Sequence, residues 1–297
     1  MKRDPLEILD VYRERVNSQL ESCLNNNTHD KNYQSKLIEI IKYSVLAGGK
    51  RFRPILTYTV ANIFGVPIER VDSSACAIEF THIYSLIHDD LPPMDDDDVR
   101  HNQPASHKVF GEAQAILAGD ALQALAFDVI SNDSLLNSDT KVRLLRILSQ
   151  SSYAMAEGQS IDLSIVSKEV DISYLDNMHK KKTGSLLNCS IMLGALLNKH
   201  TKQKDLTILN SFSNDIGLAY QIQDDVLDVT TGQEILGKRQ NSDSVKNKPS
   251  YPSILGLDKS IKTYQNLYQK ACDEISQLSE ESGPLRDLTV RLMKRSY

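Results

Sequence analysis

Residues 84–100 read YSLIHDDLPPMDDDDVR, which is the strongest signal in the sequence. Six aspartates fall within ten positions, at Asp89, Asp90 and 95–98. Pro92 and Pro93 must interrupt a helix here, because proline lacks a backbone N–H and restricts the residue before it. We expect the break to let Asp95 turn back toward Asp89 and Asp90.

Helical periodicity surrounds this stretch. The segment from Val71 to about Asp90 is rich in Ala, Ile and Leu, and residues 5–22 have apolar side chains spaced by three and four. Further helices are expected up to Val45, from Pro54, and over 112–131, 139–157, 171–198 and 203–230, with Asp139 and Asp171 as N-caps. We find no convincing strand pattern, dinucleotide loop or P-loop. The sequence predicts one all-α domain over residues 1–297.

Composition excludes several classes of protein. The 297 residues have a formal net charge of −5, which argues against nucleic-acid binding. The four cysteines lie far apart in the sequence, so we interpret them as reduced thiols. The charged N-terminal segment and the lack of a run of 18 apolar residues predict a cytoplasmic protein without stable membrane anchoring.

A second acidic motif lies in residues 219–229, AYQIQDDVLDV. Asp224 and Asp228 share one helical face, with Gln221 three positions before Asp224. The flanking residues are apolar, so this helix should be largely buried. Two carboxylates 4 Å apart repel by about 4 kcal/mol at an effective dielectric near 20. Mg²⁺ relieves such repulsion and takes one or two carboxylates plus substrate phosphates. Facing each other across a cavity, the two acidic motifs would hold a diphosphate through bridging metal ions.

Basic residues form separate clusters. Residues 47–54, AGGKRFRP, combine two glycines, three cations and a helix start, a pattern typical of an anion site. Further cations lie in KKKTG (180–184), at Arg100, and at Lys238 and Lys248 in the polar stretch 231–250. These clusters predict a second anion bound without metal. His82, two turns before Asp89 on the same face, is interpreted as a diphosphate contact.

Together these motifs resemble the trans-prenyl diphosphate synthases, and most closely the bacterial farnesyl diphosphate synthases (geranyltranstransferases). The family's DDxxxxD motif matches residues 89–95, and its DDxxD motif matches residues 224–228. GGKRFRP, GEAQAILAGDAL, KTG, LGKRQ and a YP pair also match, in the family's order from about residue 48 to 256.

The resemblance implies a fold and a set of site residues. The expected fold is a bundle of about ten mostly antiparallel helices around a deep central cavity, usually a homodimer. The metal ligands, for about three Mg²⁺ ions, would be Asp89, Asp90, Asp95, Asp224, Asp225 and Asp228. The residues expected to contact the allylic diphosphate or the carbocation are Arg100, Lys182, Lys238, Lys248, Thr183 and Gln221. Isopentenyl diphosphate would be held by Lys50, Arg53 and His82.

The implied reaction is head-to-tail condensation of isopentenyl diphosphate with dimethylallyl or geranyl diphosphate. Tyr84 and Ser85, just before the first motif, would set product length, and the aromatic ring predicts a C15 product. Residues 231–250 would close over the site. A geranyl or geranylgeranyl diphosphate synthase, a non-catalytic subunit of a heteromeric synthase, a terpene cyclase and a structural helical protein are the alternatives.

The chain departs from the family pattern at four positions. Arg100-His101-Asn102 stands where the family has Arg-Arg-Gly, and its second Arg helps to bind isopentenyl diphosphate. Histidine has a reference pKa near 6.5 and offers no bidentate fork, so binding should weaken as the pH rises. Glu157 and Asn241 replace glycines, which could alter loop closure.

Overall fold

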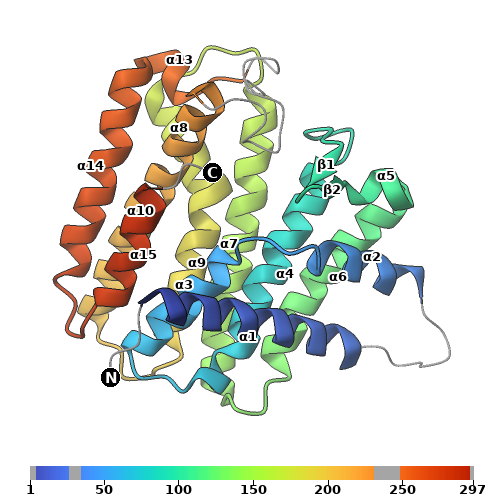
Figure 1. Ribbon diagram of the computed structural model, residues 1–297, viewed down its shortest axis with the longest axis vertical. Helices are drawn as coiled ribbons and strands as arrows, with labels where there is room; N and C mark the ends of the chain where they lie inside the picture. The colour runs from blue at the N-terminus through green and yellow to red at the C-terminus, as the bar shows by residue number, and fades with distance from the viewer. Residues whose placement is uncertain (1–4, 27–34, 231–247, 295–297) are drawn as a thin grey trace. The chain divides into compact units, whose positions relative to one another are not determined.

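The structure is a computed structural model that describes residues 5–26, 35–230 and 248–294. Helices make up almost all of the regular structure of these residues, which confirms the all-α prediction (Figure 1). The helices are α1 (Pro5–Asn26), α2 (Lys36–Val45), α3 (Phe52–Ile63), α4 (Asp72–Asp89), α5 (Ser106–Phe110), α6 (Glu112–Ser131), α7 (Ser138–Ser164), α8 (Ile172–His179), α9 (Ser185–Leu196), α10 (Gln203–Thr230), α13 (Tyr251–Leu255), α14 (Leu257–Ile275) and α15 (Gly283–Met293). A 3₁₀ turn at Ile68–Arg70 and a π-helix at Lys180–Gly184 complete them.

The chain divides into two compact units. The first comprises Met1–Leu148 with Leu196–Lys199, and the second comprises Ser149–Ala195 with His200–Tyr297. The first acidic motif lies in the first unit and the second acidic motif in the second. A single domain over 1–297, with a central cavity, stays a prediction.

The core of the first unit forms where α4 and α6 run side by side (Figure 1). Helix α6 has small residues on its buried face, including Ala115, Ala118 and Gly119. A Cβ on Gly119 would lie 2.1 Å from His88 Nε2, so glycine leaves room here for the imidazole ring of His88. By length and mean hydropathy α6 could span a membrane, and it is the one such helix among the described residues.

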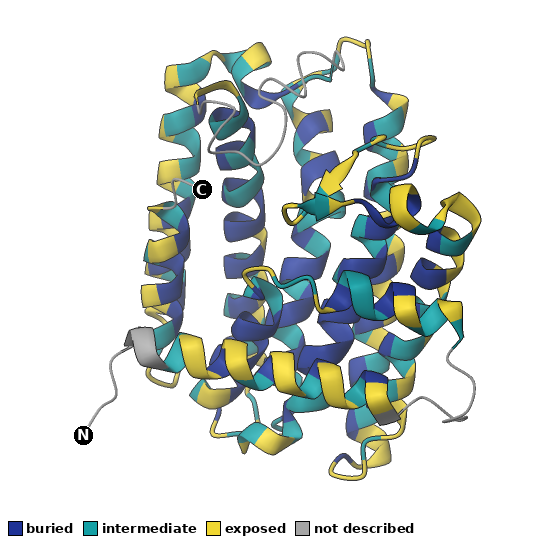
Figure 2. Ribbon diagram, turned by 45° about the vertical axis from the view of Figure 1, so that its right-hand side comes forward, coloured by how far each residue is buried: buried dark blue, intermediate teal, exposed yellow. Residues whose placement is uncertain are grey.

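Helix α1 is fixed to this core by one acidic residue. Asp72 opens α4, and Arg15 donates to both of its oxygens, from Nε and from Nη2, at 2.7 Å each. Tyr58 also donates to Asp72 at 2.7 Å, and its ring stacks on Tyr12 of α1 with centroids 5.2 Å apart. The other side of α1 is exposed (Figure 2).

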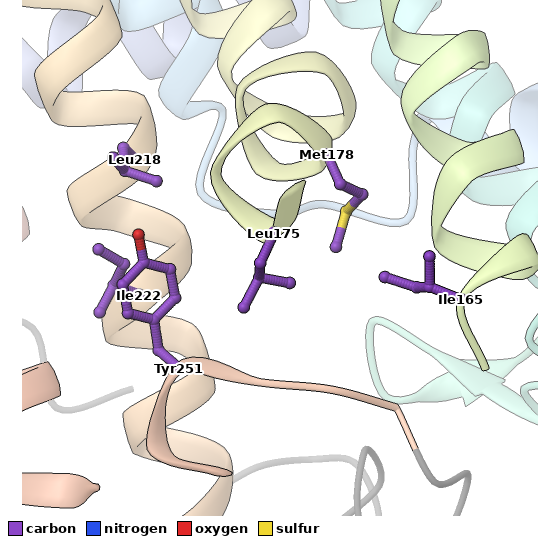
Figure 3. Close-up of a cluster of buried hydrophobic side chains, with 6 residues drawn as sticks. All are labelled: Ile165, Leu175, Met178, Leu218, Ile222 and Tyr251. Atoms are coloured by element: carbon purple, nitrogen blue, oxygen red, sulfur yellow. The ribbon is translucent and has the colours of Figure 1, made fainter. Parts of the chain in front are cut away.

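The second unit has its own core, in which α10 packs along α14. A cluster of buried residues joins α10 to α8, to the start of α13 and to Ile165, which directly follows α7. Figure 3 shows Tyr251 beside Ile222, with Leu175 between them and Met178. Helix α10 is therefore largely buried around the second acidic motif, as the apolar residues flanking the motif predicted.

The predicted helix bounds and N-caps agree with the structure at some places and differ at others. The helices 112–131 and 203–230 are confirmed to the residue. Asp171 is an N-cap, since it accepts from Tyr174 N at 2.8 Å. Asp139 is not an N-cap, because Asn137 Oδ1 accepts from Thr140 N instead. The predicted helix 171–198 is interrupted by the π-helix.

The expectation of no strands was wrong at one place. β1 (Val99–Arg100) pairs antiparallel with β2 (Gln103–Pro104), and His101 and Asn102 form the turn with φ of 51° and 61°. Positive φ at both central residues is the type I′ geometry, which suits the twist of a short hairpin. The usual Asn-Gly signal is missing here, so the pattern gave no warning.

Candidate active site

The first acidic motif folds back on itself at the end of α4. The chain leaves the helix after Asp89, and Met94 N donates to Leu91 O at 2.9 Å. Asp95 N then donates to Asp89 O at 2.8 Å. The predicted return of Asp95 to Asp89 is confirmed for the backbone, with Pro92 and Pro93 at the turn.

Asp90 is buried, whereas Asp89 and Asp95 of the same motif are only partly buried. It is only 2% exposed, and Arg100 Nε donates to its two oxygens at 3.0 and 3.2 Å, while Nη2 forms a second contact with Oδ1. Arg100 also reaches Asp97 at 3.2 Å. Burial disfavours the charged guanidinium, but the hydrogen bonds to Asp90 raise the pKa of Arg100 above its ordinary value. Asp90 therefore orients the side chain of Arg100. Arg100 belongs to β1, next to the motif.

The three cations of the glycine-rich loop have different environments. Arg51 adopts a left-handed conformation, is 4% exposed, and donates to Glu79 at 2.7 Å and to Val45 O at 2.6 Å. Arg51 is therefore held inside the first unit. Lys50 is exposed and Arg53 is partly buried, so these two cations can meet a ligand.

His82 and His101 lie beside these cations. Arg53 Nη1 donates to His82 Nε2 at 3.3 Å. Burial, followed by the positive charge of Arg53, holds the pKa of His82 well below its ordinary value, so the imidazole is neutral. His101 Cε1 lies 3.5 Å from the place where a Cβ on Gly49 would stand, directly before Lys50. The first unit thus brings the four predicted isopentenyl diphosphate residues to one place.

Tyr84 faces α6 from one turn above the acidic motif. It is 7% exposed, and Gln123 Nε2 of α6 donates to its hydroxyl at 3.3 Å. Burial raises the pKa of Tyr84 to about 12. Its ring meets the ring of His88 edge to face, with centroids 5.9 Å apart. Ser85 is partly buried and donates to His82 O at 2.7 Å.

Within the second motif, Asp225 has a different environment from Asp224 and Asp228. Asp225 is 4% exposed and accepts from Tyr251 N at 3.0 Å and from Gln221 Nε2 at 3.2 Å. His179 Nε2 lies 3.4 Å from the same carboxylate. Asp224 and Asp228 are only partly buried. Asp225 is therefore directed into the second unit.

Thr183 and Gln221 are joined directly. Thr183 Oγ1 donates to Gln221 Oε1 at 2.8 Å. Thr183 belongs to the π-helix Lys180–Gly184, and such bulges are frequent at functional sites. A Cβ on Gly217 would lie 2.9 Å from Gly184 Cα, so this glycine lets α10 approach the π-helix. Lys181 pairs with Glu157 at 2.6 Å, which gives that departure from the family pattern a local partner.

Asp162, near the end of α7, is a site residue that was not predicted from the sequence. Lys182 Nζ and Lys248 Nζ donate to its Oδ2 at 2.7 and 2.9 Å, and Asp162 is 5% exposed. Burial would raise the pKa of Asp162, but the two ammonium groups lower it below its ordinary value. One signal was available, since Asp162 stands alone between Ile161 and Leu163.

Two further predictions concern residues 231–247. Lys238, predicted to contact the allylic diphosphate, lies outside the described residues, as does Asn241. The expectation that residues 231–250 close over the site stays a prediction, because all but the last three of these residues lie outside the described ones.

The donor chemistry fits Mg²⁺. Both motifs offer carboxylate oxygens, and the backbone brings Asp95 next to Asp89. No group of three or more His, Cys, Asp or Glu side chains close enough to hold a metal is found among the described residues. Mg²⁺ typically takes only one or two carboxylates and completes its shell with water and substrate phosphates, so such a site depends on a phosphorylated ligand. That the two motifs face each other stays a prediction.

Comparison with known proteins places these features in a family. A family model described as polyprenyl synthetase matches residues 34–282. The farnesyl diphosphate synthase of Escherichia coli is 42% identical over 83% of this chain and 84% of its own length. The chloroplastic geranylgeranyl pyrophosphate synthase of Catharanthus roseus is 40% identical over 84% of this chain and 71% of its own.

Solved structures of similar proteins support the same family assignment. A geranyltransferase from Helicobacter pylori, complexed with magnesium and isoprenyl diphosphate, aligns with a TM-score of 0.85 and 30% identity, covering 99% of this chain and 97% of that one. Since the family model and these relatives all extend over most of the chain, and the motifs match in order, this chain belongs to the polyprenyl synthetase family.

Proposed function

We propose that this chain is a farnesyl diphosphate synthase, which condenses isopentenyl diphosphate with dimethylallyl and then geranyl diphosphate. The observation that supports it most is the first acidic motif, where the backbone returns Asp95 to Asp89 in a chain 42% identical to such an enzyme. We assign direct Mg²⁺ binding to Asp89, Asp95, Asp224 and Asp228, for about three ions. Asp90 and Asp225 are buried, whereas the other four aspartates are only partly buried, so we assign these two local positioning instead, which revises the sequence prediction.

The metal ions, when bound with substrate, neutralise charge on the departing diphosphate. Arg100, Lys182 and Lys248 add fixed positive charge to that leaving group, so the allylic C–O bond breaks more easily. Thr183 and Gln221 present polar oxygens to the carbocation. Because their oxygens share one hydrogen bond, their orientation is fixed before the substrate arrives.

The second substrate is held without metal. Lys50, Arg53, His82 and His101 form the basic cluster of the first unit, and we assign isopentenyl diphosphate to it. The neutral His82 accepts from Arg53, which fixes the guanidinium for a diphosphate oxygen. The alkene then attacks the allylic cation, and the released diphosphate takes the proton, since the described residues of the site offer no evident side-chain base.

One incubation tests the proposal. The protein is mixed with dimethylallyl and isopentenyl diphosphates and Mg²⁺, and the products are separated by chain length. We expect mainly C15 product. A C20 product would favour the alternative represented by the Catharanthus roseus relative, and a C10 product would indicate a geranyl diphosphate synthase. No turnover by the chain alone would favour a non-catalytic subunit.

We also propose that the protein is a cytoplasmic homodimer. Helix α6 exposes Ile116 (43%) and Leu117 (52%), and α7 exposes Val142 (63%) in the same unit. Exposed large apolar side chains are frequent at protein interfaces. Light scattering should give the mass of two chains, and Leu117→Glu should lower it. Val11→Glu, at a residue of similar exposure (40%) on α1, serves as the control. A monomeric wild type would refute this part of the proposal.

A further inference from the structure

Asp162 binds two cations at once. Lys182 comes from the π-helix after α8, and Lys248 lies shortly before α13, so the two lysines are far apart in the sequence. Both ammonium groups donate to the same atom, Asp162 Oδ2, at 2.7 and 2.9 Å. They are therefore close neighbours, although like charges would otherwise separate them.

The surroundings fix this arrangement. Asp162 is 5% exposed, while the side chains of Lys182 and Lys248 are 25% and 10% exposed. Gly158 lies one turn before Asp162 on α7, and a Cβ there would stand 2.2 Å from Lys182 N. The backbone of the π-helix thus rests on Gly158, and its lysine reaches Asp162 one turn farther along the same face.

Shared pairing leaves donors for a ligand. A lysine ammonium has three N–H donors on a flexible four-carbon chain. An ammonium that donates to Asp162 can therefore also donate to a phosphate oxygen. Holding both chains in place beforehand removes part of the entropy that a ligand would otherwise have to overcome.

We propose that Asp162 is a positioning residue that presents Lys182 and Lys248 as a pair to the allylic diphosphate. This inference rests on the proposed function, which assigns both lysines to that diphosphate. The sign of the effect separates positioning from simple charge. If Asp162 only reduced the positive charge nearby, removing it would strengthen diphosphate binding. If it positions the lysines, removing it weakens binding.

The test compares Asp162→Asn with Asp215→Asn. Asp215 also pairs with a lysine, Lys270 at 2.9 Å, in the same unit but outside the proposed site. Binding of geranyl thiodiphosphate, a non-reactive substrate analogue, is measured by calorimetry with Mg²⁺. A charge-assisted hydrogen bond lost at each lysine should weaken binding by about ten- to a hundredfold in Asp162→Asn. Asp215→Asn should bind as the wild type does.

Kinetics and a double-mutant cycle complete the test. The KM for geranyl diphosphate should rise in Asp162→Asn, while the KM for isopentenyl diphosphate stays within twofold. Lys248→Met should weaken analogue binding less in the Asp162→Asn background than in the wild type, because the lysine has already lost its position. Additive effects would overturn the proposal. Asp162→Ser replaces the Asn variant if that variant does not fold.

The outcomes separate this inference from the function it rests on. If the wild type binds no analogue and forms no prenyl product, the proposed function fails. If the wild type does both and Asp162→Asn binds the analogue equally or more tightly, the positioning role is refuted and the function stands.

Discussion

Replacing Tyr84 by alanine should lengthen the product. Tyr84 lies five residues before Asp89 on α4, which places it about 7–8 Å farther down the helix axis. Its ring is 7% exposed and held by Gln123 and His88, so it cannot easily move aside. We expect this ring to close the floor of the channel that receives the growing hydrocarbon tail.

The size of the effect follows from the tail itself. Each CH₂ moved from water into an apolar channel gains about 0.8 kcal/mol, so a five-carbon unit gains about 4 kcal/mol. That corresponds to about a thousandfold in binding, and an open channel would therefore keep accepting units. Only a rigid floor stops the tail at C15. Tyr84→Ala should form C20 and longer products from the same substrates.

The assay measures products by chain length after incubation with isopentenyl and dimethylallyl diphosphates. Tyr84→Phe keeps the ring and loses the hydrogen bond to Gln123, so C15 should remain its main product. Tyr12→Ala removes a tyrosine of the same 7% exposure on α1 and should leave the product length unchanged. If Tyr84→Ala turns over and still yields only C15, Tyr84 is not the floor.

Three further changes test other parts of the site. His101→Arg should lower the KM for isopentenyl diphosphate, because the guanidinium is always charged and offers a bidentate fork that histidine lacks; equal KM values for the wild type and His101→Arg would refute this. Arg51→Met leaves the buried carboxylate of Glu79 unpaired and should lower the free energy of unfolding by about 3 kcal/mol in thermal melts. The control variant Lys50→Met should leave the free energy of unfolding unchanged and raise the KM for isopentenyl diphosphate. Gly158→Ala pushes a Cβ to 2.2 Å from Lys182 N and should lower both kcat and the melting temperature; wild-type values of both would show that α7 yields freely.

The sequence predicted the helices well where apolar periodicity continues without interruption, as in α6 and α10. It failed where local geometry depends on packing. The π-helix at Lys180–Gly184 adds one residue per turn and leaves no mark in the apolar pattern, so residues 171–198 read as one helix. The hairpin at Arg100 has strands of two residues, too short for any alternation to show.

Candidate site residues were predictable by type, and their partners were not. Both acidic motifs were found because clustered carboxylates require compensation. However, the sequence predicted Asp90 and Asp225 to be metal ligands like their neighbours. In the structure both are buried and hydrogen bonded inside their own units. Asp162 was missed for the same reason, because its two lysine partners come from distant parts of the chain. Pairing of this kind depends on tertiary contacts, which spacing in the sequence does not reveal.

The proposed function requires that the acidic motifs bind a diphosphate through divalent cations. Calorimetry with geranyl thiodiphosphate, performed once with Mg²⁺ and once with a chelator, tests it most directly. We expect tight binding with Mg²⁺ that disappears with the chelator and is strongly weakened by Asp89→Asn or Asp224→Asn. Equal affinity in the presence of the chelator would contradict it.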